Sequence, residues 1–490
     1  MAQKGAFLRA AETAEADPHG AFRSAAQGNG GTDGTAQALA FLLSCGLLEQ
    51  RGGSLRAAEG VPPETLRLFA GFLDRFAPRI AFAPLADCPV HVCTAMPGPL
   101  PEGWRREALQ PLLTQLACGG QGLERHRAVL GCLGELAERL SLIVQGPEDP
   151  LVLERQGEDD EDLPAGAFLQ FSAAQEKELA ARVPALAAVW EDERIGWNRL
   201  SPRRMRVTSA FSDEAALIPA FAVLLGEGQN AGLPQLPLGP TLGSALGSTL
   251  GAAVWTDRET AARRAVLELA ERDAAGIWWH NRLGITPLPW AQVREFLPKI
   301  CADWLSARAR VTHFLYLPVD FSLHVIAAVS HGEDGKSGVI GVAGGLEAGA
   351  VLQSAIGELV QGEFALELAG RRSASGKEGG TVSALQSYAA RDVRQDLRLE
   401  AATAAVVQDL EREFSWQEFE ASLMAQKIRI WLADCSRAET GLACVKAVSL
   451  DLCSWLPRFG NPRLFTSPVR WGLRPLPAEE GEFSGRHYPF

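Results

Sequence analysis

The feature of the chain most able to do chemistry is an acidic pentad that occurs twice. Glu135-Leu136-Ala137-Glu138-Arg139 recurs as Glu268-Leu269-Ala270-Glu271-Arg272, and Glu358-Leu359-Val360-Gln361 is a partial third copy. Glutamates three residues apart lie on the same face of a helix. The neighbouring residues are mostly Ala, Leu, Val and Gly, so we expect these faces to be partly buried. A buried carboxylate pair needs a counter-charge, or its pKa rises and it takes up a proton.

A magnesium ion can supply that charge, because Mg²⁺ is held by few carboxylates together with phosphate oxygens. Two such helices facing one another would form an acidic cage for Mg–nucleotide, with the metal bound by Glu135, Glu138, Glu268 and Glu271. The competing interpretation is a solvated helix surface, where Glu-x-x-Glu is common, but the second identical copy favours the metal site. The glycine-rich stretch Gly120-Gln121-Gly122 precedes the first helix, and such a turn can offer N–H groups to phosphate.

The elements that must position these residues alternate between apolar strands and long helices, which predicts an α+β (mixed α/β) core. Gly332–Ser337 contains Gly-Lys-Ser, but Ser330 stands where a P-loop requires glycine, so no P-loop is predicted. We expect strands at Val90–Thr94, Leu315–Val319, Leu323–Val329 and Val339–Val342, and helices at Arg127–Leu142, Glu259–Trp279, Trp290–Arg310 and Ala350–Leu368.

Residues 1–85 are expected to form a separate N-terminal region with a poorly ordered start. A helical pattern over Thr35–Leu48 leads into a short strand and the Gly52-Gly53 turn, which resembles part of a winged helix; a plain helix–turn–strand is the alternative. A further helix is expected at Glu64–Phe76. The predicted domains are therefore residues 1–85 and 86–490.

The bulk composition narrows the class of protein. The 490 residues carry a net charge of −12 and are 47% hydrophobic, which suits a soluble protein and argues against a nucleic-acid partner. The densest basic run is Arg203-Arg204-Met205-Arg206, which we expect to be a solvated strand end. No uninterrupted apolar stretch predicts a membrane span. Nine scattered cysteines with no Cys-x-x-Cys pair indicate reduced thiols in the cytoplasm.

Together these motifs resemble the signatures of the YcaO family over roughly residues 85–490. Gly120-Gln121-Gly122, Ala128 and the first pentad are similar to the first signature of the family. The segment from Gly251 to Trp279 resembles the second, and Gly341 to Gln361 resembles the third, where Ala355, Glu358 and Gln361 fit.

The resemblance implies an ATP- and Mg²⁺-dependent enzyme that phosphorylates a peptide backbone amide after a Cys, Ser or Thr side chain attacks it, giving a thiazoline or oxazoline. It implies Arg272 as a catalytic residue. It also implies partners: a precursor peptide, a ubiquitin-activating-like leader-binding protein, a flavin dehydrogenase and a second copy in a homodimer. ATP is expected to be bound by Gly120, Gln121, Gly122, Glu135, Glu138, Glu268, Glu271, Glu358 and Gln361.

Several positions depart from the family pattern, and they leave two hypotheses open. Gln121 replaces a lysine, Leu250 an asparagine, and Thr256 and Thr260 stand at two further polar positions. The four glutamates favour a cyclodehydratase in the maturation of a ribosomally made peptide such as a bacteriocin. The substitutions favour a scaffold that binds peptide or partner enzymes and turns over ATP poorly. A plain nucleotide-binding α/β protein outside the family is a third possibility.

Overall fold

The fold is mixed, with helices packed on small antiparallel sheets, and this confirms the α+β prediction. The computed structural model describes residues 5–16, 34–51, 54–98, 100, 118–146, 148–154, 163, 166–182, 203–227, 249–374, 386–399, 407 and 409–483. The chain divides into two compact units: Met1–Gln145 with Ala253–Ala261 and Cys435–Val445, and Gly146–Ala252 with Ala262–Asp434 and Lys446–Phe490. Residue 85 lies within the first unit, and the two-domain assignment stays a prediction.

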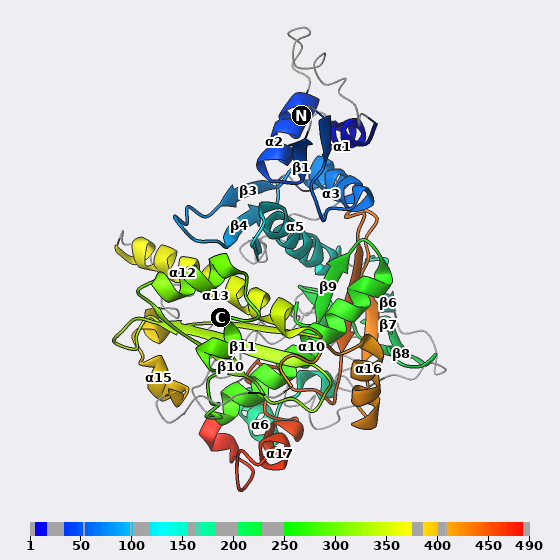
Figure 1. The fold of residues 1–490 in the computed structure, drawn as a ribbon. Helices are drawn as coiled ribbons and strands as arrows, with labels where there is room; N and C mark the ends of the chain where they lie inside the picture. Colours follow the sequence, from blue (N-terminus) through cyan, green and yellow to red (C-terminus); the bar gives the residue numbers. More distant parts are fainter. Residues whose placement is uncertain are drawn as a thin grey trace. The chain divides into compact units, whose positions relative to one another are not determined.

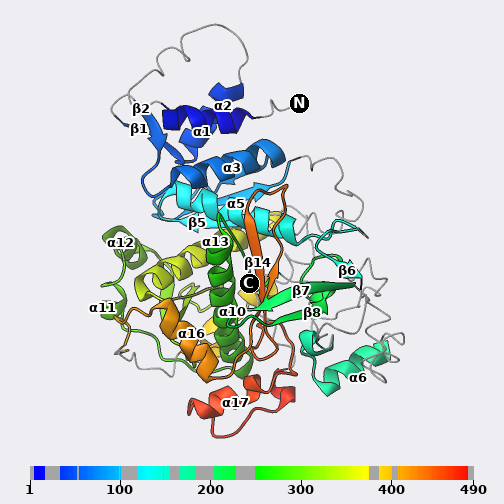
Figure 2. The same cartoon turned by 90° about the vertical axis from the view of Figure 1, so that its right-hand side faces the viewer.

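The start of the first unit is a cluster of three helices and a hairpin (Figure 2). Asp74 accepts hydrogen bonds from the backbone N–H groups of Phe7 and Leu8 at 2.9 and 2.8 Å, which orders a helix where we expected little order. Local composition could not reveal this cap, because Asp74 is distant in sequence. The elements are compatible with a winged helix, which stays a prediction: α1 (Ala6–Ala16), α2 (Gly34–Ser44), β1 (Leu48–Arg51), β2 (Ser54–Ala57) and α3 (Pro63–Phe76).

A three-stranded antiparallel sheet follows, with the order β3 (Arg79–Phe82), β4 (His91–Met96), β5 (Cys118–Gly122), and α5 (Arg125–Leu142) packs on β4 and β5. The expected glycine-rich turn is wrong, because its residues form β5. A Cβ on Gly120 would lie 2.1 Å from the carbonyl oxygen of Ala128, so the missing side chain lets the strand lie directly on α5.

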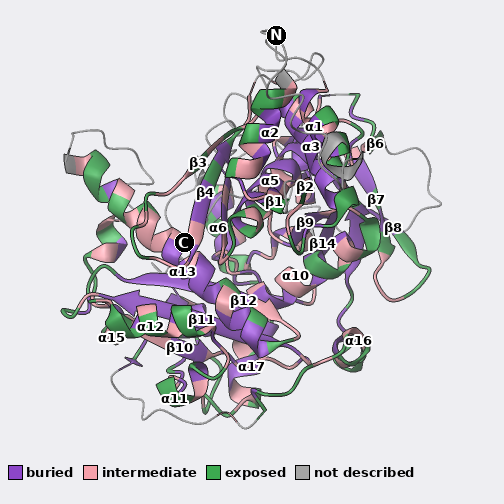
Figure 3. Cartoon of the chain, turned by 45° about the horizontal axis from the view of Figure 1, so that its top comes forward, coloured by how far each residue is buried: buried purple, intermediate pink, exposed green. Residues whose placement is uncertain are grey.

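The second unit contains a similar β-β-β-α arrangement. β10 (Val311–Tyr316), β11 (His324–His331) and β12 (Val339–Gly345) form an antiparallel sheet, which α13 (Ala348–Ala374) covers (Figure 1). Every residue of β11 is buried (Figure 3), which explains the uninterrupted apolar run 325–329 at its centre. β10 begins earlier than the predicted Leu315, because Val311 to Phe314 also pair with β11.

In the same unit β7 (Arg203–Ser209) pairs antiparallel with β6 (Leu153–Glu154), β8 (Ala215–Pro219) and β13 (Trp431–Asp434). The predicted solvated strand end is wrong. Arg204 is 1% exposed, and Arg203 lies 2.9 Å from the fully buried carboxylate of Glu227. Burial raises the pKa of Glu227 to about 7, although Arg203 opposes the shift.

The long helix α10 (Arg258–Asn281) confirms the helix expected around the second pentad. The single helix expected over Trp290–Arg310 is wrong, because Pro298 directly precedes a new helix and disfavours helical backbone at the residue before it. The other elements are η3 (Gly166–Leu169), α6 (Ala173–Arg182), η4 (Ala220–Ala222), β9 (Ala252–Trp255), α11 (Trp290–Val293), α12 (Lys299–Ala307), α15 (Val393–Asp396), α16 (Trp416–Ala425), β14 (Ala443–Val448), α17 (Arg463–Arg470) and η6 (Glu480–Phe483).

Disulfides and membrane-spanning helices were not expected. In this structure none of the nine cysteines forms a disulfide bond. Among the helices of the described residues, none is both long and apolar enough to cross a membrane.

Candidate active site

In the first unit, α5 places the first pentad against the outer edge of β5. One oxygen of Glu135 accepts the backbone N–H of Gly119 at 2.7 Å, and the other pairs with Arg139 one helical turn later. Burial opposes the charge of Arg139, but the carboxylates of Glu135 and Glu138 outweigh it and raise the pKa of that guanidinium. Glu135 therefore finds its charged partner and its N–H donor within its own helix and strand.

In the second unit, α10 places the second pentad against β12. Glu271 accepts the backbone N–H of Gly344 at 2.8 Å, and Arg272 lies 3.1 Å from its other oxygen and 3.7 Å from Glu268. A Cβ on Gly344 would lie 2.8 Å from the Cβ of Glu271, so the glycine is what permits this approach. The pentad is thus pressed onto the backbone of a strand that is distant in sequence.

The partial third copy meets the same strand. Glu358 on α13 accepts the backbone N–H of Val342 at 3.1 Å. Val342 and Gly344 are two residues apart, so their N–H groups point the same way, and β11 is the only strand that β12 pairs with among the described residues. Two glutamates from two helices therefore occupy the outer edge of β12.

Two carboxylates at this edge have raised pKa values. Burial, chiefly, with help from Glu358 and Glu268, raises the pKa of Glu271 to about 8, and Arg272 only partly opposes the shift. Burial and Glu358 also raise the pKa of Glu268, against the opposing charges of Arg272 and Lys446. Since these carboxylates disfavour one another's ionised form, a bound cation would stabilise that form.

Arg272, the predicted catalytic residue, is held from its other side by an aromatic ring. Its guanidinium carbon lies 3.8 Å from the ring centroid of Trp455, and its side chain is 12% exposed. Such stacking fixes the plane of an arginine side chain. The guanidinium of Arg272 therefore lies between the ring of Trp455 and the carboxylates of Glu268 and Glu271.

The remaining predicted residues are spread over both units. Gln121 pairs with Val92 within β5, while Gln361 lies on α13 one turn after Glu358. Their nucleotide contacts, like those of Gly120 and Gly122, stay predictions, as does the expectation that the two pentads face one another. Leu250 and Thr260 flank β9, and Thr260 donates its N–H to Asp257 at the start of α10.

Two residues beside the second pentad were not predicted from the sequence. We call the second pentad, together with Glu358 and these two residues, the second cluster. Lys446, 3% exposed on β14, opposes the burial of Glu268, and Trp455 stacks on Arg272. Lys446 could have been found from the sequence, because it is a lone lysine in the apolar run Ala443–Val448 and lysine is almost never buried unless it is paired. No local pattern indicates the tryptophan, which lies far from the pentad in sequence.

The second cluster fits Mg–nucleotide on the chemistry of its donors. Its carboxylates are oxygen ligands, and in the part of the chain described Glu271 Oε1 is buried and accepts no hydrogen bond, with Arg272 as its charged contact. No group of three or more His, Cys, Asp or Glu side chains within the described ranges is arranged to hold a metal by itself. Mg²⁺ in nucleotide sites characteristically takes one or two carboxylates and completes its shell with phosphate and water oxygens.

Comparisons with solved structures agree with this fold. A heterocyclase in complex with substrate and cofactor is 20% identical, with a TM-score of 0.64, and the match covers 84% of this chain and 55% of that one. The heterocyclase TruD is 19% identical, with a TM-score of 0.52 and coverages of 75% and 51%. The chain thus spans about half the length of these two proteins. YcaO from Methanopyrus kandleri, bound with AMPPCP and Mg²⁺, is 14% identical, with a TM-score of 0.50 and coverages of 76% and 85%.

A comparison with curated proteins gives no match. A family model described as YcaO cyclodehydratase, ATP- and Mg²⁺-binding, matches residues 119–450, which is more than half of the chain. The description names the two cofactors that we predicted, and the match excludes a plain nucleotide-binding protein outside the family. The chain therefore belongs to the YcaO family.

Proposed function

We propose that this chain uses ATP to activate backbone amides of a ribosomally made precursor peptide and cyclodehydrates Cys, Ser or Thr residues to thiazolines or oxazolines. The observation that carries the proposal is the raised pKa of Glu268 and Glu271, which burial and the nearby carboxylate of Glu358 produce beside Arg272. Closely spaced carboxylates in a largely buried setting are an arrangement that a bound divalent cation would stabilise. Membership of the YcaO family supports the same chemistry.

When bound, Mg–ATP supplies a phosphoryl group that converts the amide oxygen from a poor leaving group into a good one. The carboxylates of Glu268 and Glu271 would hold the metal, and Arg272 would balance the charge that develops on the phosphoryl oxygens; a metal-binding role of Glu135 and Glu138 stays a prediction. In the peptide, the attacking side chain forms one bond to the amide carbon and loses its proton. The carbon–oxygen bond then breaks while the amide nitrogen loses its proton and forms the carbon–nitrogen double bond of the ring. The oxygen leaves as phosphate, and ADP is the other product.

The biological setting belongs to the same proposal. The partners would be a precursor peptide, a leader-binding protein related to ubiquitin-activating enzymes, a flavin dehydrogenase that oxidises the rings, and a second copy of the chain. The cytoplasm is the proposed compartment. The heterocyclase in complex with substrate and cofactor supports this chemistry as a structural relative of low identity.

The test mixes the purified protein with Mg–ATP and peptides rich in Cys, Ser and Thr. We expect phosphate release, with the peptide losing the mass of one water for every ring formed. Glu268→Gln combined with Glu271→Gln should abolish both signals while the protein stays folded by circular dichroism. Ring formation that continues in this double variant would contradict the role given to the carboxylates.

The alternative is a scaffold that binds peptide or partner enzymes with weak turnover. The substitutions Gln121, Leu250, Thr256 and Thr260 favour it, because each replaces a polar or cationic residue of the family pattern. Peptide binding by calorimetry without phosphate release would support this alternative over the enzyme.

A further inference from the structure

Residues 449–462 lie between β14 and α17 and contain no helix or strand, yet α10 fixes their course. The backbone N–H of Cys453 donates to Asp273 at 2.8 Å, and the carbonyl oxygen of Trp455 lies 3.0 Å from Nε2 of His280. Between them, a Cβ on Gly276 would lie 2.6 Å from the carbonyl oxygen of Ser454. We call residues 449–462 the Trp455 segment.

These anchors share one face of α10. Asp273, Gly276 and His280 follow one another at spacings of three and four residues, which is the periodicity of a helix stripe. His280 is 1% exposed, so this end of the stripe is buried. Thus α10 presents this stripe to the Trp455 segment and presents Glu271 to β12.

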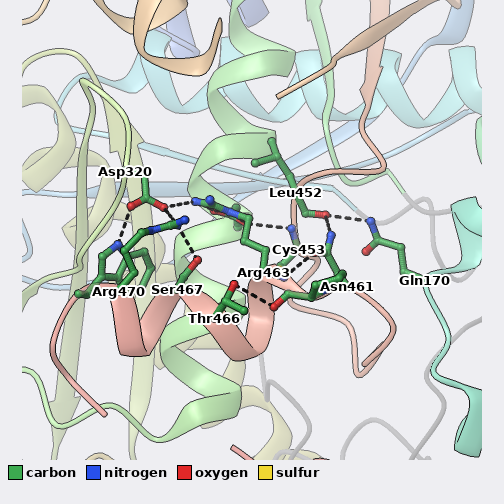
Figure 4. Close-up of polar contacts among 12 residues, drawn as sticks. Gln170, Asp320, Leu452, Cys453, Asn461, Arg463, Thr466, Ser467 and Arg470 are labelled. Carbon is green, nitrogen blue, oxygen red and sulfur yellow. Dashed lines mark hydrogen bonds and ion pairs between the residues drawn. The ribbon is translucent and has the colours of Figure 1, made fainter. Parts of the chain in front are cut away.

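The far end of the segment is fixed by a buried ion pair. Arg463, the first residue of α17, donates from Nε and Nη2 to Asp273 at 2.8 to 3.0 Å, and it also lies 2.8 Å from Asp320. Figure 4 shows Arg463 among these contacts, with Leu452 accepting from Gln170. Asp273 and Arg463 have side-chain exposures of 2% and 8%, so the pair is shielded from solvent.

The segment delivers one side chain to the candidate active site. The guanidinium carbon of Arg272 lies over the ring of Trp455, 3.8 Å from its centroid. An arginine side chain has several rotatable bonds, so its two carboxylate contacts alone do not fix the plane of the guanidinium. An anchored ring does fix it, because the ring blocks rotation out of the stack.

We propose that Trp455, held by the contacts of its segment with α10, is a positioning residue that orients Arg272 for the phosphoryl group of the nucleotide. The role of Arg272 rests on the proposed function, whereas the orientation itself can be measured without turnover. Trp455 acts only through Arg272.

The first test measures the accessibility of Arg272 by phenylglyoxal labelling and peptide mass spectrometry, without nucleotide. Trp455→Leu should label at Arg272 about tenfold faster than the unaltered protein, and Trp455→Phe, which keeps a ring, within about twofold. The control is Trp416→Leu, which removes a second Arg–Trp stack on α10, where Arg263 lies 5.3 Å from Trp416, and should leave Arg272 labelling unchanged. Equal labelling of Arg272 in Trp455→Leu and the unaltered protein would overturn the proposal.

A second variant keeps the test decisive if Trp455→Leu does not fold. Gly276→Ala leaves Trp455 and Arg272 intact but places a methyl group against Ser454, which pushes the segment away from α10. It should raise Arg272 labelling in the same direction by a smaller factor, about threefold. Unchanged labelling in a folded Gly276→Ala protein would count against the anchoring.

The third readout is steady-state kinetics with peptide and Mg–ATP. Trp455→Leu should lower kcat about tenfold and leave KM for ATP within about threefold, and Trp455→Phe should restore kcat. An equal loss in Trp416→Leu would contradict the specific role of Trp455. If the unaltered protein releases no phosphate, the proposed function fails, and the labelling still decides whether Trp455 positions Arg272.

Discussion

In α5 the carboxylate of Glu135 contacts Arg139 and the N–H of Gly119, and in α10 Glu271 makes the equivalent contacts with Arg272 and the N–H of Gly344, but the side chain of Glu135 is 31% exposed and that of Glu271 only 10%. The two pentads have the same sequence, so the difference comes from what the rest of each unit places beside them. On β12 a third carboxylate, Glu358, joins the second pentad. The same motif thus lies in a more exposed setting in the first unit and beside a further carboxylate in a more buried setting in the second.

This difference predicts which of the two pentads is stabilised more by a bound cation. A balanced ion pair gains little from a new positive charge, whereas a crowded carboxylate group gains much. The second pentad should therefore contribute most of the energy of metal binding.

Removing the arginine of each pentad should have the largest effect. Arg272→Met leaves Glu268, Glu271 and Glu358 with less compensation and should lower the free energy of unfolding by about 3 kcal/mol at pH 8. The side chain of Arg139 is 23% exposed and that of Arg272 is 12% exposed. Arg139→Met should therefore lower the free energy of unfolding by only about 1 kcal/mol. Urea denaturation of both variants checks this, and equal losses would remove the contrast between the pentads.

Neutralising one glutamate in each pentad tests metal binding directly. Glu271→Gln should weaken Mg–ATP binding at least about tenfold, because it removes a charge from the crowded group. Glu135→Gln should weaken it less than about threefold, since Arg139 already offsets that carboxylate. Titration calorimetry gives both affinities. A larger loss in Glu135→Gln would reverse our assignment of the two halves.

The pH dependence of stability should carry the signature of Glu271. Its pKa is raised from 4.5 in the unfolded chain to about 8 in the folded state, so between these values the folded protein holds a proton that the unfolded chain releases. Stability from this group is therefore present at low pH and is lost as pH rises through that window. Glu271→Gln lacks this loss, so its Tm relative to the unaltered protein should rise from pH 5 to pH 8 and then level off. Scanning calorimetry in matched buffers checks the rise, and a flat difference would contradict the raised pKa.

The smallest contrast concerns glycines beside the glutamates. A Cβ on Gly134 meets nothing within 4 Å, so Gly134→Ala should stabilise α5 by about 0.5 to 1 kcal/mol. Gly344→Ala should instead destabilise its unit and weaken Mg–ATP binding, because its Cβ would lie 2.8 Å from Glu271. Thermal unfolding and calorimetry separate the two variants. Tolerance of alanine at position 344 would argue against the close approach.

The sequence was informative where an element carried its own signal. The helices around Glu135, Glu268 and Glu358 were predictable, because each is long and has a regular apolar pattern. The strand β5 was not, since glycines that pack a strand on a helix look like a turn. The burial of Arg203 also escaped prediction, because it depends on Glu227, which lies on another element.

The candidate site, too, was only partly predictable from the sequence. Its glutamates and Arg272 could be named from a repeat, but their contacts could not, because the N–H groups of Val342 and Gly344 and the ring of Trp455 come from distant segments. A sequence motif identifies the charged side chains of the site. It does not identify the backbone N–H groups that these side chains bind.

The glutamates at the edge of β12 have a consequence for how such sequences evolve. Exposed strand edges recruit strands from other molecules, and a carboxylate on each free N–H prevents that pairing. Selection against aggregation alone would therefore retain Glu271 and Glu358 in a descendant that had lost its chemistry. Survival of these residues is thus a poor guide to whether a relative is still active, and Arg272 and its tryptophan partner are better ones.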